Sequence, residues 1–215
     1  MYRAVIFDLD GTLLDTSRDI CIVLNDALSV FGCPAISLEK TIEYVGNGAR
    51  KLVERAVPGG FERTEELYNY YKVKFAACDN KHTRLYDGEV EFLKAIKANV
   101  VKTAILTNKP DDAAQNVCAQ LLSPFSFDFI MGQTGRFALK PDPGAVLYLI
   151  EQMGVGAEQC LFVGDGETDV VTAANAGIDC ASVLWGFRTQ AQLAAAGAKM
   201  FVSTYAQLLS LVCGQ

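Results

Sequence analysis

The sequence has no excess of positive charge and no long apolar run, and each absence argues against a class of partner. Lys and Arg number 19 against 25 Asp and Glu, a net charge of −6. This argues against nucleic acid as a partner, because such proteins usually carry a basic face. No stretch approaches the roughly 20 apolar residues of a membrane span, so we expect no membrane partner. The first apolar run ends at Asp8, so we also expect no signal peptide and a cytoplasmic location.

The sequence also lacks paired cysteines and has a single histidine. The cysteines are odd in number, scattered and without a Cys-x-x-Cys pair: Cys21, Cys33, Cys78, Cys118, Cys160, Cys180 and Cys213. Several lie in apolar runs, which favours buried free thiols in a reducing compartment over disulfides or zinc ligands. His82 is the lone histidine, and we expect it to be structural.

What the sequence does contain is a series of short apolar runs, each followed by a helical pattern. The runs cover residues 4–7, 100–106, 127–131, 161–163 and 180–184. Near-continuous apolar strands that alternate with helices are typical of a parallel sheet covered on both faces. We therefore predict an α/β fold with a Rossmann-like, doubly wound parallel sheet. In such sheets ligands bind beyond the carboxyl ends of the strands.

The alternation stops between about residues 15 and 84, where the sequence has a helical pattern throughout. The expected helices cover residues 17–31, 38–57 and 62–78. Ser37 is placed to cap the second of them. A helical segment of this length between the first two strands indicates an inserted lid. We predict a catalytic core of residues 1–14 and 84–215 and a helical cap domain of residues 15–83.

Two carboxylates follow the first strand, in Asp8-Leu9-Asp10-Gly11-Thr12. At the exposed end of a buried strand, acids two residues apart repel each other and need a cation. Gly11 allows a tight backbone turn after them. Taken alone, the pair is equally compatible with an ordinary Asp-rich turn.

A second acidic group follows the fourth strand, in Gly164-Asp165-Gly166-Glu167-Thr168-Asp169. If the fourth strand lies beside the first, Asp165 comes close to Asp8. The resulting group of oxygens is the environment that Mg²⁺ prefers. An acidic helix start, stabilised by the helix dipole, would explain Glu167 and Asp169 as well, but it explains Asp165 less well.

Two further signals lie at other strand ends. The second strand ends in Thr107-Asn108-Lys109-Pro110, where Pro110 suits the first helical position and the free N–H groups of the helix start can receive a phosphate. Lys140 precedes Pro141 before the next helix. A lysine there is usually a solvated loop charge, but a phosphoryl site rich in carboxylates would need a fixed cation.

In this order, at successive strand ends, these signals closely resemble the four motifs of the haloacid dehalogenase-like hydrolase superfamily. The matching segments are Asp8-x-Asp10-Gly11-Thr12, Thr107-Asn108, Lys140-Pro141 and Gly164-Asp165-x-x-x-Asp169. The helical stretch matches the helical cap of the subgroup with an insertion between the first two motifs. The resemblance extends over the entire chain.

The resemblance implies a phosphatase mechanism with a role for each matched residue. Asp8 would be the nucleophile and would form an aspartyl-phosphate, while Asp10 would act as general acid and then base. Thr107 and the Asn108 N–H would hold the phosphoryl oxygens. Lys140 would balance charge and orient Asp8.

The same resemblance implies Mg²⁺ as cofactor. An oxygen of Asp8, the backbone carbonyl of Asp10 and the carboxylate of Asp165 would hold the ion, with Asp169 near it as a further ligand or an orienting group. The cap would close over the site to exclude water.

Specificity is expected to lie in the cap, where the segment from Tyr44 to Leu52 resembles that of bacterial phosphoglycolate phosphatases. Its glycines, Gly46 among them, would let a helix N-terminus approach a small anion, with Asn47 as a further substrate contact and with Arg50 or its neighbour Lys51 pairing with a carboxylate. A glycine turn followed by solvated basic residues is the alternative. We predict a small phosphorylated metabolite as substrate, with 2-phosphoglycolate as first candidate and either a monomer or a homodimer.

Other functions within the superfamily stay open to different degrees. Inorganic pyrophosphatases and sugar phosphatases share most of these motifs. A β-phosphoglucomutase-like mutase is disfavoured because Ile20 stands where its histidine would lie, and a dehalogenase because Asp10 is present. A non-catalytic binding protein has no physical reason to keep mutually repelling acids. Gly166 departs from the commoner serine or threonine of the fourth motif, and Arg188 fits solvent or substrate contact equally well.

Overall fold

The sheet at the centre of the protein is entirely parallel. The computed structural model describes residues 1–214, and its six-stranded sheet has the order β5-β4-β1-β6-β7-β8. The strands are β1 (Ala4–Phe7), β4 (Lys102–Pro110), β5 (Phe129–Gln133), β6 (Cys160–Gly164), β7 (Asp179–Val183) and β8 (Met200–Val202). The first strand in sequence is therefore central, between β4 and β6.

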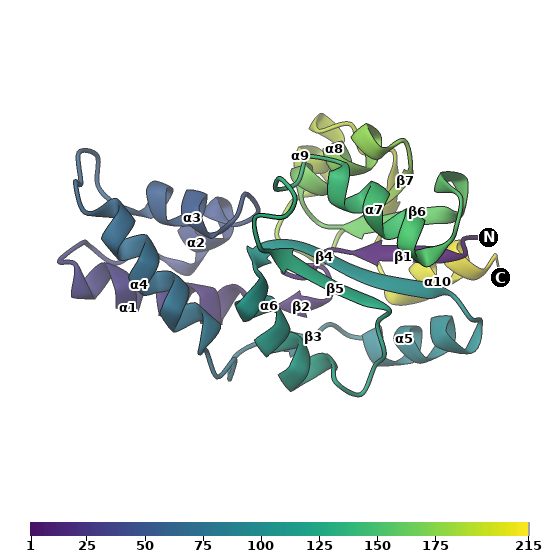
Figure 1. Ribbon diagram of the computed structural model, residues 1–215, viewed down its shortest axis with the longest axis horizontal. Coiled ribbons are helices and arrows are strands. Elements are labelled where there is room, and N and C mark those ends of the chain that lie inside the picture. The colour runs from purple at the N-terminus through teal and green to yellow at the C-terminus, as the bar shows by residue number, and fades with distance from the viewer. Residues whose placement is uncertain (215) are drawn as a thin grey trace.

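Helices cover both faces of this sheet (Figure 1). Val5 and Phe7 of β1 pack toward α5 (Glu89–Ala98), α6 (Asp111–Val117), η1 (Cys118–Leu122) and α10 (Tyr205–Cys213). Ala4 and Ile6 pack toward α7 (Gly144–Met153) and α8 (Glu167–Ala176). The short η2 (Ala157–Gln159) and α9 (Gln190–Ala195) lie in connections. Because successive side chains alternate between two buried faces, β1 is apolar throughout, and the predicted doubly wound α/β fold is confirmed.

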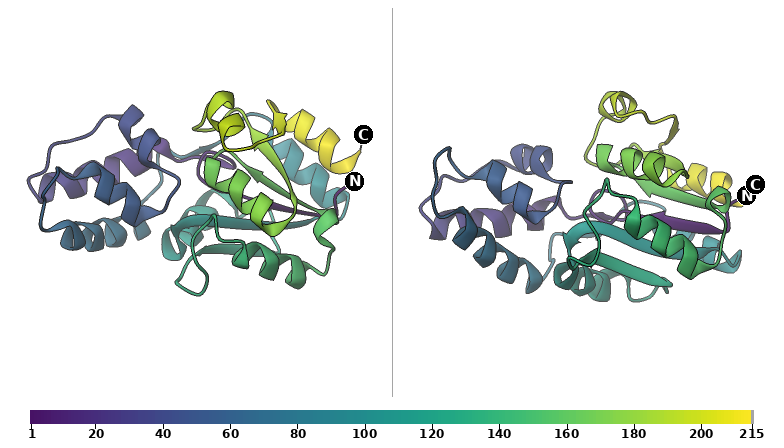
Figure 2. Two further views of the ribbon diagram at one scale, coloured as in Figure 1. Left: turned by 90° about the horizontal axis from the view of Figure 1, so that it is seen from above. Right: turned by 45° about the horizontal axis from the view of Figure 1, so that its top comes forward.

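Four helices form a separate body beside the carboxyl edge of the sheet, as Figures 1 and 2 show in three views. They are α1 (Ser17–Val30), α2 (Leu38–Tyr44), α3 (Ala49–Ala56) and α4 (Thr64–Ala76). We call this body the cap. Its own apolar core includes Leu24, Leu67 and Tyr71, all fully buried, and Ala113 of α6 packs into that core. The cap therefore rests on the sheet domain through α6.

The sequence prediction of one helix over residues 38–57 is wrong. The segment breaks between α2 and α3, where Gly46 and Gly48 adopt φ angles of 118° and 86°, a region that suits glycine and strains other residues. The predicted cap at Ser37 is confirmed, because its side chain accepts a hydrogen bond from the Lys40 N–H. The strand β8 was not predicted, since three residues at a sheet edge give too short a pattern.

Two short strands join the cap to the sheet domain. β2 (Leu14–Asp15) pairs antiparallel with β3 (Arg84–Leu85), so the chain leaves and re-enters the sheet domain at one place. The buried Asp19 at the start of α1 accepts hydrogen bonds from the His82 N–H and the Thr83 hydroxyl, at 3.0 and 2.6 Å. The side chain of His82 is exposed, and the bond to Asp19 comes from its backbone N–H.

Two expectations from composition can be compared with the fold. Each of the seven cysteines is a free thiol, and Cys33, Cys118, Cys160 and Cys213 are buried, as predicted. Within residues 1–214, none of the helices combines the length and the apolar character needed to cross a bilayer.

Candidate active site

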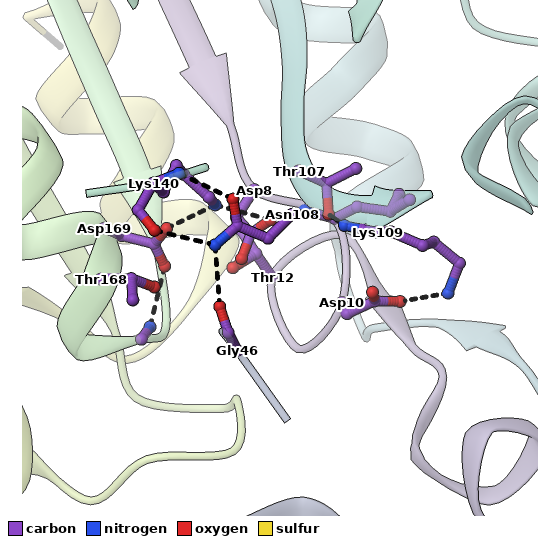
Figure 3. Close-up of polar contacts among 12 residues, drawn as sticks. Asp8, Asp10, Thr12, Gly46, Thr107, Asn108, Lys109, Lys140, Thr168 and Asp169 are labelled. Atoms are coloured by element: carbon purple, nitrogen blue, oxygen red, sulfur yellow. Dashed lines mark hydrogen bonds and ion pairs between the residues drawn. The ribbon is translucent and has the colours of Figure 1, made fainter. Parts of the chain in front are cut away.

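The residues predicted to carry chemistry meet at the carboxyl edge of the sheet (Figure 3). Phe7 of β1 is paired with Ile105 of β4 on one side and with Val163 of β6 on the other. Asp8 directly follows Phe7, so it lies between Thr107 on β4 and Asp165 after β6. The strand register therefore brings together three of the four motifs, and the loop between β5 and α7 adds the fourth, Lys140.

Lys140 is a buried cation shared by two carboxylates. Its Nζ lies 2.9 Å from Oδ1 of Asp8 and 2.7 Å from Oδ1 of Asp169. Burial disfavours the ammonium form, but the charges of Asp169 and Asp8 outweigh it and raise the pKa of Lys140. Lys140 therefore stays charged and fixes the position of Asp8.

Asp165 is fixed by two hydrogen bonds and packs closely against two glycines. Its Oδ1 accepts a hydrogen bond from Thr12 Oγ1 at 2.9 Å, and its Oδ2 accepts one from the Phe187 N–H at 2.7 Å. An added Cβ at Gly11 or at Gly186 would overlap the Asp165 side chain. Burial, reinforced by the nearby charge of Asp169, raises the pKa of Asp165 to about 7.

The acidic group has a composition that suits a divalent cation. Oxygens of Asp8, Asp165 and Asp169 lie within 4.8 Å of one another. Burial raises the pKa of Asp8 to about 8, with Lys140 opposing the shift and Asp169 and Asp165 adding to it. A cation beside these oxygens would favour their ionised forms. Asp169 is fully buried, and its oxygens already accept from Lys140 and the Gly166 N–H, which favours an orienting role for Asp169.

Asp10 is turned away from Asp8 toward another cation. Its Oδ1 accepts hydrogen bonds from the Thr16 hydroxyl at 2.6 Å and from Lys109 Nζ at 2.9 Å. The Lys109 side chain is only 2% exposed. Its Nζ also lies 4.0 Å from the ring centroid of Phe75 in α4 of the cap. Sequence reasoning assigned no role to Lys109, because a lysine between Asn108 and Pro110 has the pattern of a solvated loop.

Thr107 and Asn108 are both buried at the end of the β1–β4 pairing. The Asn108 amide donates to the Gly46 carbonyl at 3.0 Å and to the Lys140 carbonyl at 3.1 Å, and it accepts from the Lys140 N–H at 2.8 Å. The Asn108 side chain therefore joins the Lys140 loop to the cap. Pro110 caps α6 rather than occupying its first turn, because the helix starts one residue later than predicted.

The three cap residues predicted to bind substrate have different surroundings. Gly46 lies against the site through its bond to Asn108. Asn47 accepts a hydrogen bond from Arg55 at 2.8 Å. Arg50 points away from the site, where it pairs with Glu65 and stacks over the Tyr68 ring. The structure therefore does not bring Arg50 to the site, and its partner Glu65 on α4 explains why.

Arg188 neither faces solvent nor lies free to meet substrate. Its guanidinium donates to the carbonyls of Ile42 and Val45 at 2.8 and 2.6 Å, and to a Glu167 carboxylate oxygen at 2.9 Å. Ile42 lies in the last turn of α2 and Val45 directly follows the helix, where a helix leaves acceptors unpaired and carries a negative dipole end. Arg188, a residue of the sheet domain, thus holds the cap in place.

Between cap and sheet lies a narrow cleft. Asp8, Asp10, Thr107 and Lys109 line it from the sheet domain, and apolar or aromatic cap residues close it. The cap side chains in the lining are Ile20, Val45, Ala49, Leu52, Tyr71 and Phe75. The cavity volume is about 40 Å³, room for no more than a few water molecules. The cap is therefore closed in this structure, and a phosphate ester would enter only after it moves.

Comparisons with known proteins agree with this fold and site. A family model described as haloacid dehalogenase-like hydrolase matches residues 5–183. Phosphoglycolate phosphatase 1 of Pseudomonas aeruginosa is 37% identical over 191 residues, which cover 86% of this chain and 70% of that protein. Phosphoglycolate phosphatase of Colwellia psychrerythraea is 29% identical over 215 residues, covering 96% and 95%. A crystal structure from Lactobacillus delbrueckii subsp. bulgaricus superimposes with a TM-score of 0.92 at 29% identity, covering 100% and 99%.

The chain belongs to the haloacid dehalogenase-like hydrolase family, as its four motifs predicted. Its relatives place it in the phosphoglycolate phosphatase-like subgroup, and it is a phosphatase.

Proposed function

We propose that the protein is a Mg²⁺-dependent phosphatase that hydrolyses a small phosphate monoester through an aspartyl-phosphate on Asp8. The observation that carries this proposal is the contact between Lys140 and Asp8, at 2.9 Å, beside a second carboxylate group. A carboxylate fixed in this way is an adequate nucleophile once the charge of the phosphoryl oxygens is neutralised.

Each residue of the site would have a separate role in the reaction. An oxygen of Asp8 attacks phosphorus, and the ester oxygen leaves with a proton supplied by Asp10. Thr107 and the Asn108 N–H would hold the phosphoryl oxygens during transfer. Asp10 would then take a proton from the water that cleaves the aspartyl-phosphate, which restores Asp8 and releases phosphate.

Asp8, Asp165 and the Asp10 carbonyl would hold Mg²⁺, with Asp169 orienting Lys140. When Asp8, Asp10, Asp165 and Asp169 are all ionised, the ammonium groups of Lys109 and Lys140 leave two negative charges in the site. A bound Mg²⁺ would supply positive charge that stabilises the transferring phosphoryl group. The hydrogen bonds from Thr12 and Phe187 keep Asp165 in place for this role.

The substrate proposed first is 2-phosphoglycolate. Two of the relatives compared above are named for that activity. Pyrophosphate and small sugar phosphates are the substrates against which it should be compared. A cytoplasmic location and a monomeric or homodimeric state remain predictions.

The proposal is tested by phosphate release from a panel of small phosphate esters, with Mg²⁺ and with a chelator. We expect turnover only with Mg²⁺ and 2-phosphoglycolate among the best substrates by kcat/KM. Asp8→Asn should abolish turnover, whereas Asp87→Asn, at an exposed acid outside the site, should retain it. Equal turnover by Asp8→Asn would refute the mechanism, and a poor rate with 2-phosphoglycolate alone would refute only the substrate.

A further inference from the structure

The cleft contains a cation and a hydroxyl that the proposed mechanism does not use. Among the residues that line it within 1–214, Lys109 is the one with a positive charge. Tyr71 lines the same cleft from α4 and is fully buried. The two residues come from different parts of the fold, the sheet domain and the cap, so they form one surface only when the cap is closed.

The position of Lys109 relates it to the leaving group and not to the phosphoryl group. Lys140 contacts Asp8, the proposed nucleophile, whereas Lys109 contacts Asp10, the proposed proton donor to the leaving oxygen. Figure 3 shows the two lysines on opposite sides of Asp8. A cation beside Asp10 therefore faces whatever is attached to the ester oxygen.

Lys109 has hydrogen-bonding capacity left for a ligand. An ammonium group has three donors. In the described part of the chain, the one side-chain acceptor bonded to the Lys109 ammonium is Asp10. The face of the Phe75 ring, 4.0 Å away, stabilises the charge without accepting a conventional hydrogen bond. At least one donor can thus be offered to an anion that enters the cleft.

The Tyr71 hydroxyl is a second, independent group in the cleft that can bind a ligand. Within residues 1–214 its buried hydroxyl has no hydrogen-bond partner. Leaving a buried donor unpaired is unfavourable by about 1–3 kcal/mol, so native proteins usually satisfy such groups. The Tyr71 ring stacks on Phe75, with centroids 5.1 Å apart, and Phe75 also lies against Lys109. The unpaired hydroxyl and the cation thus share one aromatic neighbour.

We propose that Lys109 and Tyr71 form the binding site for a carboxylate carried by the leaving group of the substrate. The proposal rests on the proposed function and names the part of the site that would select an acidic ester. It gives the chain a carboxylate receptor where Arg50, paired with Glu65 outside the cleft, cannot act as one.

The alternative role for Lys109 is that of a counter-ion to Asp10 alone. The two roles differ in their dependence on substrate. A counter-ion would affect every phosphate ester to the same degree, whereas a carboxylate receptor would affect only esters that carry the carboxylate.

The test compares 2-phosphoglycolate with 2-hydroxyethyl phosphate, which has an alcohol in place of the carboxylate. We expect Lys109→Met to lower kcat/KM for 2-phosphoglycolate roughly 10- to 100-fold more than for the alcohol ester, since a charged hydrogen bond is lost. Lys109→Arg should restore part of that difference. Lys72→Met, at an exposed lysine on the same helix as Tyr71, should leave both rates unchanged.

A second variant, Tyr71→Phe, tests the proposal even if Lys109→Met does not fold. It removes only the Tyr71 hydroxyl, which has no hydrogen-bond partner within residues 1–214. We expect it to lower kcat/KM for 2-phosphoglycolate roughly 3- to 10-fold, mostly through KM, with little change for the alcohol ester. Equal losses with both esters in both variants would overturn the proposal, as would a native enzyme that does not prefer the acidic ester. A native protein inactive on all esters would instead refute the proposed function itself.

Discussion

Arg188 of the sheet domain donates a hydrogen bond to the Val45 carbonyl at the end of cap helix α2, at 2.6 Å. With the second bond, to Ile42, the guanidinium joins two bodies that are also connected through β2 and β3, packed at α6 and bonded from Asn108 to Gly46. The closed cleft depends on this contact, because Arg188 supplies positive charge where the helix dipole is negative.

Replacing Arg188 is therefore expected to loosen the cap. In Arg188→Gln, amide hydrogens of residues 42–48 should exchange faster than in the native protein, and kcat/KM should fall roughly 10-fold as the closed state loses population. Arg188→Lys should recover little, because an ammonium cannot reproduce the guanidinium fork. Arg18→Gln, at an exposed arginine, serves as control. Unchanged exchange in residues 42–48 would show that Arg188 does not hold the cap.

Loss of Lys140 should affect both stability and activity. Lys140→Met leaves Asp8 and Asp169 buried without their shared cation, which is expected to lower the free energy of unfolding by about 3 kcal/mol. Phosphatase activity should fall at least 100-fold, because Asp8 is no longer held. Urea unfolding and phosphate release measure the two effects. A variant as stable and as active as the native protein would contradict the role given to this lysine.

The loss of kcat on replacing Asp10 should be larger when the leaving group must be protonated to depart. Asp10→Asn should reduce kcat on alkyl phosphates by about 10²- to 10⁴-fold. The reduction should be much smaller on an aryl phosphate such as 4-nitrophenyl phosphate, whose leaving group departs as a stable anion. The comparison uses the same variant and buffer with both substrates. Equal reductions would indicate that Asp10 acts by position or charge and not as a proton donor.

A group far from the chemistry should make stability fall with rising pH. Glu89 is fully buried, and this burial raises its pKa from 4.5 to about 8. The folded state thus binds more protons than the unfolded state between these values. The stabilisation is present below about pH 4.5 and is lost as pH rises through about 8, with a slope of up to about 1.4 kcal/mol per pH unit.

Glu89→Gln should remove the part of this slope that Glu89 contributes, since its amide does not titrate. The buried Asp8 and Asp165, whose pKa values are also raised, contribute to the slope in both proteins. The free energy of unfolding from urea titrations at pH 5.5, 7 and 8.5 should then vary less than in the native protein, and the variant should be the more stable of the two at the highest pH. Glu91→Gln, at an exposed acid on the same helix, should keep the native slope. If the native protein shows no such slope, Glu89 is not protonated in the folded state.

The parts of the site that the sequence predicted are those fixed by strand register. Asp8, Thr107 and Asp165 each follow a buried apolar strand, so parallel pairing alone brings them to one edge. The family resemblance adds Lys140, whose own pattern is that of a loop charge. These residues can be located because their positions depend on local patterns and on the order of a few strands.

The parts that the sequence did not predict depend on contacts between distant segments. The Lys109 ammonium lies against Phe75 of the cap, and the Arg188 guanidinium bonds to carbonyls at the end of α2 as well as to Glu167. Arg50 was expected near the site on the pattern of its own segment, but Glu65, on another helix, holds it outside. A linear pattern records the residue types at such positions but not which segment will face them.

The pairing of Leu14 with Leu85 has a consequence for how such proteins can change. Because β2 and β3 hold the two ends of the cap segment side by side, the sheet domain requires only that an inserted segment start and finish at neighbouring points. Residues 16–83 could then be exchanged for another module with closely spaced ends while the strand register around Asp8 stays intact. Selectivity and chemistry could therefore diversify separately along a lineage.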